Sequence, residues 1–144
     1  MILSAQQLFS DDQAITATAV STNVIDLGTP GTPYGGNSLN QDIGKGAAVP
    51  VLIQVTEAFD NLTSLTVSLE VSANSDLSSS TVLNTEVITL ANLKPGKQTF
   101  MQYLPNGVDA RYLGVRYTVT GTAPTAGAIT AGISMGNQTN TTGA

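Results

Sequence analysis

Cysteine and histidine are both absent from the 144 residues of this sequence. The absence of cysteine excludes disulfides and thiolate chemistry. The absence of histidine removes the commonest metal ligand and the general base whose pKa lies nearest neutral pH. We therefore expect a protein that is not an enzyme, with no catalytic residues, no metal ligands and no cofactor.

Charge is also scarce. Only 10% of the residues are charged, against about 25% in an average soluble domain, and the net charge is −5. Five basic residues cannot build the clustered positive face that nucleic-acid binding requires. A surface of hydroxyl and amide groups suits close contact with another protein, because few ions must be desolvated, and it also suits sugars.

Long hydrophobic runs are missing as well. No stretch approaches the roughly 18 apolar residues of a membrane span, so we expect no membrane association. The first residues have neither the positive start nor the apolar run of a signal peptide. We expect the chain to be made in a cytoplasm.

What the sequence does contain is period-two alternation of apolar and polar residues, which is typical of half-buried antiparallel strands. It is clearest in residues 65–71, 113–119, 129–135 and 49–55, and weaker in residues 14–20, 23–27, 82–90 and 98–104. Turn residues separate these segments, as in Lys94-Pro95-Gly96-Lys97. About eight short strands in one domain predict an all-β, two-layer antiparallel β-sandwich with a jelly-roll-like arrangement.

Three segments lie outside this pattern. Residues 1–13 carry apolar side chains without a strand-like register, so we expect an N-terminal arm ahead of a sandwich domain spanning residues 14–136. Residues 28–48 form a loop of a length that is usually functional, with Tyr34 among glycines and Thr-Pro steps. Residues 137–144 are polar or small, and we expect a flexible tail.

The strand around residues 112–117 holds the most distinctive local pattern. Tyr112 and Arg116 are predicted on its outward face, with Gly114 between them leaving the sheet surface open. An aromatic ring beside an arginine can stack a sugar or anchor a protein partner, although an ordinary strand gives the same pattern.

The acidic residues suggest no catalytic pair. Asp11 and Asp12 are neighbours that point apart on an extended chain, and the remaining acids are scattered singly. Residues 73–76 resemble a fragment of a calcium loop, but the spaced ligands and the closing glutamate are missing.

The opening residues 1–16 (MILSAQQLFSDDQAIT) resemble the start of the capsid cement, or decoration, proteins of tailed bacteriophages. Further similarity lies in residues 21–28 (STNVIDLG), 110–113 (ARYL) and 124–131 (PTAGAITA), and it extends to about residue 135. Residues 28–46 and the polar tail depart from the family's pattern.

The resemblance implies a jelly-roll-like module on the capsid surface of the virion, which binds the outside of an assembled shell and bridges neighbouring major capsid subunits. Expected partners are the major capsid protein and further copies of the chain, as a homodimer or homotrimer. The contact candidates are Ile2, Leu3, Leu8, Phe9, Tyr34, Tyr112 and Arg116. A carbohydrate-binding β-sandwich on the virion is the alternative, although aromatics make up only 5% of the chain and tryptophan is absent.

Overall fold

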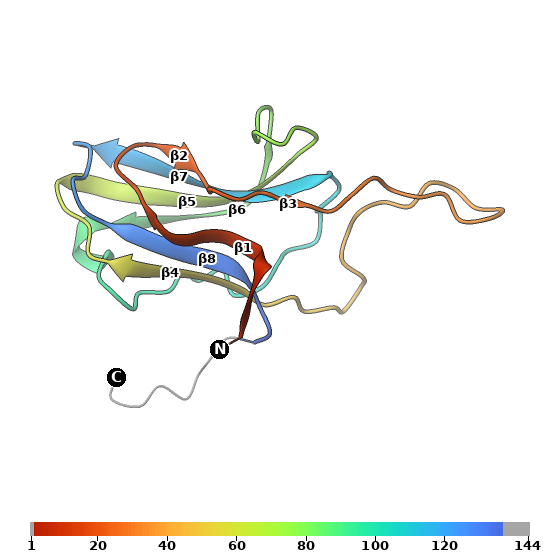
Figure 1. Cartoon of the computed structure of the whole chain (residues 1–144), viewed down its shortest axis with the longest axis horizontal. Coiled ribbons are helices and arrows are strands. Elements are labelled where there is room, and N and C mark those ends of the chain that lie inside the picture. Colours follow the sequence, from red (N-terminus) through yellow and green to blue (C-terminus); the bar gives the residue numbers. More distant parts are fainter. Residues whose placement is uncertain (1, 137–144) are drawn as a thin grey trace.

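The protein folds as two antiparallel β-sheets packed face to face, in a computed structural model that describes residues 2–136 (Figure 1). The smaller sheet has the strand order β1-β8-β4, and the larger has the order β2-β7-β5-β6, with β3 also paired to β7. The strands are β1 (Leu3–Ala14), β2 (Ala19–Val20), β3 (Ile25–Asp26), β4 (Val51–Glu57), β5 (Leu62–Ser72), β6 (Thr81–Thr89), β7 (Tyr112–Gly121) and β8 (Ala128–Ser134). The predicted all-β sandwich is confirmed.

Helical structure is limited to one short 3-10 turn among the described residues, η1 (Leu90–Asn92), which follows β6. Accordingly, residues 2–136 contain no helix long and apolar enough to cross a membrane.

The hydrophobic core lies between the two sheets and comes largely from alternate residues of β5 and β7. In β5, Leu65, Val67 and Leu69 are fully buried, while the residues between them point to the outer face. β7 repeats this pattern with buried Leu113 and Val115. The period-two alternation seen in the sequence therefore marks the two central strands of the larger sheet.

The N-terminal segment differs from the expectation of a separate arm. Strand β1 is an integral edge strand of the smaller sheet and pairs with β8. Its register shifts three times, between Leu3 and Leu8, between Leu8 and Ser10, and between Ser10 and Gln13. Asp12 also has a positive φ of 49°. Because each bulge interrupts the alternation of side chains, this strand leaves no period-two pattern in the sequence.

The order of strands is that of a jelly roll, in which the chain crosses repeatedly between two sheets. Residues 96–104, between η1 and β7, run along the free edge of β4 as an irregular fourth strand of the smaller sheet. Val55 N–H donates to the Lys97 carbonyl at 2.9 Å, and Thr99 N–H donates to the Ile53 carbonyl at 3.1 Å. The edge of β4 is therefore covered by the chain itself.

Two close contacts hold the smaller sheet in place. The hydroxyl oxygens of Ser10 in β1 and Tyr117 in β7 lie 2.8 Å apart in a buried hydrogen bond. Burial raises the pKa of Tyr117 well above its ordinary value. Before β8, Gly127 has a φ of 129° and lies directly against the Phe59 ring, where a Cβ atom would collide with it. The first contact joins β1 to the larger sheet, and the second packs the turn before β8 against the connection between β4 and β5.

Candidate interaction surfaces

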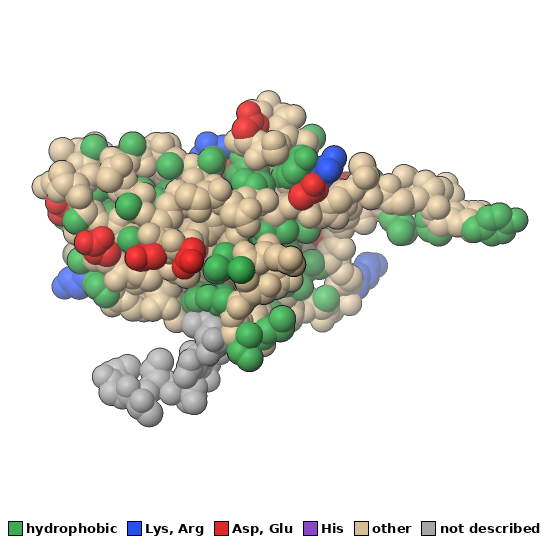
Figure 2. Space-filling view, in the orientation of Figure 1, with side chains coloured by type: hydrophobic (Ala, Val, Ile, Leu, Met, Phe, Trp, Pro, Cys, Tyr) green, Lys and Arg blue, Asp and Glu red, His purple; other side chains and the backbone are tan. Residues whose placement is uncertain are grey.

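The most conspicuous surface feature is the projecting loop, residues 28–48, which extends away from the sandwich (Figure 1). Its two limbs meet through the Leu39 N–H, which donates to the Gly31 carbonyl at 2.9 Å, and a turn joins Pro33 to Gly36. Tyr34 lies in this turn with its side chain fully exposed. Figure 2 shows hydrophobic side chains at the far end of the loop.

The base of the projecting loop is held by polar anchors. Gln41 Nε2 donates to the Leu27 carbonyl at 2.8 Å. The Asp42 carboxylate accepts the N–H of Gly107 at 3.0 Å and the N–H of Val108 at 3.2 Å. The bond from Gly107 and the further backbone N–H bonds hold the pKa of Asp42 below its usual value. The loop is thus fixed at its root, while its apolar end has no cover within the described chain.

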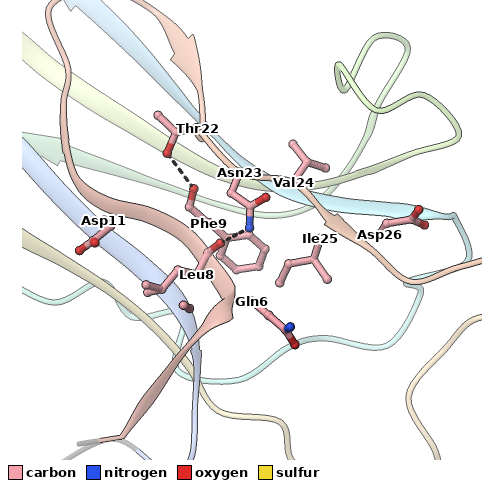
Figure 3. A pocket seen from close by; sticks show the side chains of 10 residues that line it. Gln6, Leu8, Phe9, Asp11, Thr22, Asn23, Val24, Ile25 and Asp26 are labelled. Atoms are coloured by element: carbon pink, nitrogen blue, oxygen red, sulfur yellow. Dashed lines mark hydrogen bonds between the residues drawn. The ribbon is translucent and has the colours of Figure 1, made fainter.

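A second surface is the recess of about 550 Å³ between β1 and the chain around β3 (Figure 3). Leu8 and Phe9 line one side, and Val24 and Ile25 line the other. Asn23 bridges the two sides of the recess, because its side-chain amide donates to the Leu8 carbonyl at 2.7 Å.

The predicted N-terminal contact residues divide between surface and core. Phe9 is fully buried in the hydrophobic core and is not available to a partner, which differs from the expectation. Leu3 and Leu8 are half-buried, and Ile2 is 70% exposed just before β1. The structure therefore leaves Ile2 as the freely accessible apolar side chain of this group.

The strand with Tyr112 and Arg116 is less open than the sequence suggests. Leu77, from the loop after β5, is fully buried over Gly114, where an added Cβ atom would lie 2.6 Å from it. Arg116 Nε lies 2.9 Å from the carboxylate of buried Glu70. Arg116 Nη2 also donates to the Leu77 carbonyl at 2.9 Å and so holds the loop in place. The expected open platform between Tyr112 and Arg116 is therefore absent.

The Tyr112 side of that loop borders a polar recess lined by Asn74, Ser75 and Asp76. Ser78 N–H donates to the Asp76 carboxylate at 2.9 Å, and hydrogen bonds from Ser78 lower the pKa of Asp76. This carboxylate therefore stabilises the turn that it belongs to, within the segment that resembles a fragment of a calcium loop.

Two further carboxylates whose pKa values are lowered, those of Asp26 and Asp60, also hold loops in place. Arg111 pairs with Asp26 at 2.8 Å and, together with the Gly28 N–H, lowers the pKa of Asp26 to about 2. Asp60 accepts the N–H groups of Thr125 and Ala126, and bonds from Thr125 and Ala126 lower its pKa. Within residues 2–136, no group of three or more acidic side chains is placed to hold a metal ion.

Sequence reasoning missed the exposed apolar positions outside the projecting loop. Val82 and Val87 on β6 are 52% and 62% exposed, and Phe100 is 80% exposed. The alternation in residues 82–90 was visible in the sequence, but it does not say which strand of a sheet lies at the edge. The predicted polar tail, residues 137–144, lies outside the described residues.

Comparison with known proteins identifies a family. A search of curated proteins finds no match. A model of the protein family described as Bbp16 matches residues 9–133, which covers nearly the whole sandwich and the projecting loop. The chain belongs to the Bbp16 family.

Proposed function

We propose that this protein is a capsid cement protein of a tailed bacteriophage, which binds the outer surface of the assembled shell and bridges neighbouring major capsid subunits. The observation that carries the proposal is the projecting loop. The base of this loop is held by hydrogen bonds to the Asp42 carboxylate, while the Tyr34 side chain at its far end is fully exposed. An apolar end held away from its own domain is suited to reach an adjacent protein.

The surface composition supports the same function. Charged residues are few, so a large contact can form without desolvating many ions. Figure 2 shows a face on which acidic and basic side chains are few.

The mechanism follows from linkage. Packaged DNA pushes outward and loads the contacts between capsid subunits. A protein that binds the expanded lattice better than the unexpanded one stabilises the expanded state by that difference in binding free energy. A body bound to one subunit and a loop bound to the next make the second contact effectively intramolecular.

Substitution of Tyr34 by alanine tests the proposal. Burial of an aromatic side chain stabilises a complex by about 2–3 kcal/mol, so Tyr34→Ala should weaken binding to expanded capsids about 30- to 150-fold. Tyr103→Ala is the matched control, because Tyr103 is 56% exposed but lies outside the projecting loop. Binding is measured by co-sedimentation with capsids stripped of this protein, in expanded and unexpanded form.

Two results would count against the proposal in different ways. Equal binding of Tyr34→Ala and the unaltered chain would remove the projecting loop from the contact. Failure of the unaltered chain to bind expanded capsids at all would end the assignment as a cement protein.

A carbohydrate-binding module is the second candidate, favoured by the polar recess beside Tyr112. The Arg111 guanidinium lies over the Tyr112 ring, 5.1 Å from the ring centre, in a cation–π contact that helps to hold the ring in place. Amide, hydroxyl and carboxylate groups from residues 74–76 line the recess. A glycan array probed with the unaltered chain and with Tyr112→Ala distinguishes the two functions: sugar binding requires a signal that the substitution abolishes.

A further inference from the structure

The far end of the projecting loop is a defined β-turn. Gly36 N–H donates to the Pro33 carbonyl at 3.0 Å, which closes a four-residue turn over residues 33–36. Tyr34 and Gly35 are its two central residues. Gly35 has a φ of 70°, whereas the φ of Tyr34 is not positive. A positive φ at the second central residue alone is typical of a type II turn.

Gly35 is the residue that this turn requires. In the left-handed region the Cβ atom of an L-residue lies too close to the following carbonyl oxygen, so glycine is favoured there and asparagine is the usual substitute. A Cβ atom at Gly35 would have no atom beyond its chain neighbours within 4 Å, so the requirement concerns backbone conformation and not space. Gly36 has no positive φ, and a Cβ atom there would make ordinary contact with Pro33 at 3.5 Å.

The limbs behind the turn are restrained as well. Pro30 and Pro33 have φ angles fixed by their rings. The bond from Leu39 N–H to the Gly31 carbonyl joins the two limbs, and the Asp42 carboxylate holds the base of the loop. A restrained loop loses less conformational freedom on binding, so more of its contact energy appears as affinity.

The chemistry of the loop end is apolar and uncharged. Residues 27–41 contain no charged side chain. Tyr34 is fully exposed and Leu39 is 57% exposed, and Figure 2 shows hydrophobic side chains at the far end of the loop. Aromatic residues that dominate protein interfaces fill desolvated pockets, and here no ion has to be desolvated when the ring is buried. The surface complementary to this loop end is therefore an apolar pocket.

We propose that the projecting loop inserts the Tyr34 ring into an apolar, uncharged pocket of the neighbouring major capsid subunit, and that Gly35 is the positioning residue that presents the ring. This inference rests on the proposed function, and it adds the chemistry of the partner's site and the backbone conformation that binding requires. Only molecules in which the turn is formed bind. A substitution that depopulates the turn therefore weakens the apparent affinity by the same factor.

Two variants that each add a single methyl group test the role of Gly35. Gly35→Ala should raise the dissociation constant for expanded capsids about 5- to 30-fold, because alanine disfavours the left-handed conformation. Gly36→Ala is the matched control and should stay within about twofold of the unaltered chain, because its φ is not positive. Gly35→Asn should remain within about threefold of the unaltered chain, because asparagine tolerates this conformation. Each variant should keep the melting temperature of the unaltered chain, because both positions are exposed.

A double variant and a salt series complete the test. If Gly35 acts by presenting Tyr34, Gly35→Ala should change the affinity less than about twofold in a chain that already carries Tyr34→Ala. Salt reports on the charge of the pocket. The ratio of the dissociation constants of Tyr34→Ala and the unaltered chain should stay constant between about 0.05 M and about 0.5 M sodium chloride, because an apolar contact is not screened by ions.

Binding is measured by co-sedimentation with expanded capsids stripped of this protein. The role of the Gly35 conformation is overturned by full binding of Gly35→Ala, by equal losses in Gly35→Ala and Gly36→Ala, or by a Gly35→Asn variant as weak as Gly35→Ala. A full additional loss in the double variant overturns the positioning of Tyr34, and a ratio that falls with salt overturns the uncharged pocket. All of these results leave capsid binding by the unaltered chain intact, whereas absence of that binding ends the proposed function itself.

Discussion

Phe9→Ala is the substitution that most directly tests the place of β1 in the fold. The Phe9 side chain is fully buried within the main core cluster. The backbone around it is held on both sides, by pairing of β1 with β8 and by the Asn23 N–H, which donates to the Phe9 carbonyl at 2.9 Å. A site held in this way cannot collapse onto the space left by the ring.

The expected cost follows from that rigidity. Truncation of a buried phenylalanine to alanine lowers the free energy of unfolding by about 3–5 kcal/mol, and incomplete relaxation places Phe9 near the middle or top of that range. For a domain of this size, about 4 kcal/mol corresponds to a fall of roughly 15 °C in the melting temperature. Such a loss is a large part of the stability of an ordinary domain.

Urea unfolding followed by far-UV circular dichroism measures this change, and the slope m should stay constant. Ile2→Ala is the control, because Ile2 is 70% exposed and lies just before the start of β1. A loss below about 1 kcal/mol for Phe9→Ala would refute the argument and restore the view of residues 1–13 as a separate arm. By the same reasoning, deletion of residues 1–10 should unfold the protein, so Tyr34 is the better site for testing capsid contact.

Three further outcomes follow from single side chains. Burial raises the pKa of Tyr117, so the protonated Tyr117 stabilises the fold below the ordinary tyrosine pKa near 10, and this stabilisation is lost as the pH rises above it. Tyr117→Phe should lower the free energy of unfolding by about 1 kcal/mol at neutral pH, because the hydrogen bond is lost. Between about pH 9 and pH 11, measured by urea titration, the variant should lose less stability than the unaltered chain. Arg111 lowers the pKa of Asp26 from 3.8 to about 2, so the pair stabilises the fold above about pH 4 and ceases to do so as the pH falls to 2. Asp26→Asn should therefore flatten the dependence of the unfolding free energy on pH in that window, and an unchanged dependence would contradict the role of the pair. Gly127→Ala combines a φ of 129° with a collision against the Phe59 ring and should destabilise the protein by about 2–4 kcal/mol in thermal unfolding, whereas a neutral effect would show that the turn can move.

The alternating residues of β5 and β7 were sufficient to predict the fold class. Each has a regular register, so Leu65, Val67 and Leu69 alternate with polar residues without interruption, and the pattern is readable from the chain alone. The projecting loop was also predictable, because its length and its Thr-Pro and glycine content are incompatible with a strand.

The sequence by itself thus determined a two-layer β-protein with an exposed loop and few charges. Only the tertiary structure decided that β1 belongs to the sheet, because three register shifts hide its alternation, and that Phe9 is core. It also decided that Arg116 is paired to Glu70, a partner 46 residues away in the chain. Edge position, burial of an ion pair and coverage of Gly114 depend on contacts between distant segments, and local periodicity carries no information about those contacts.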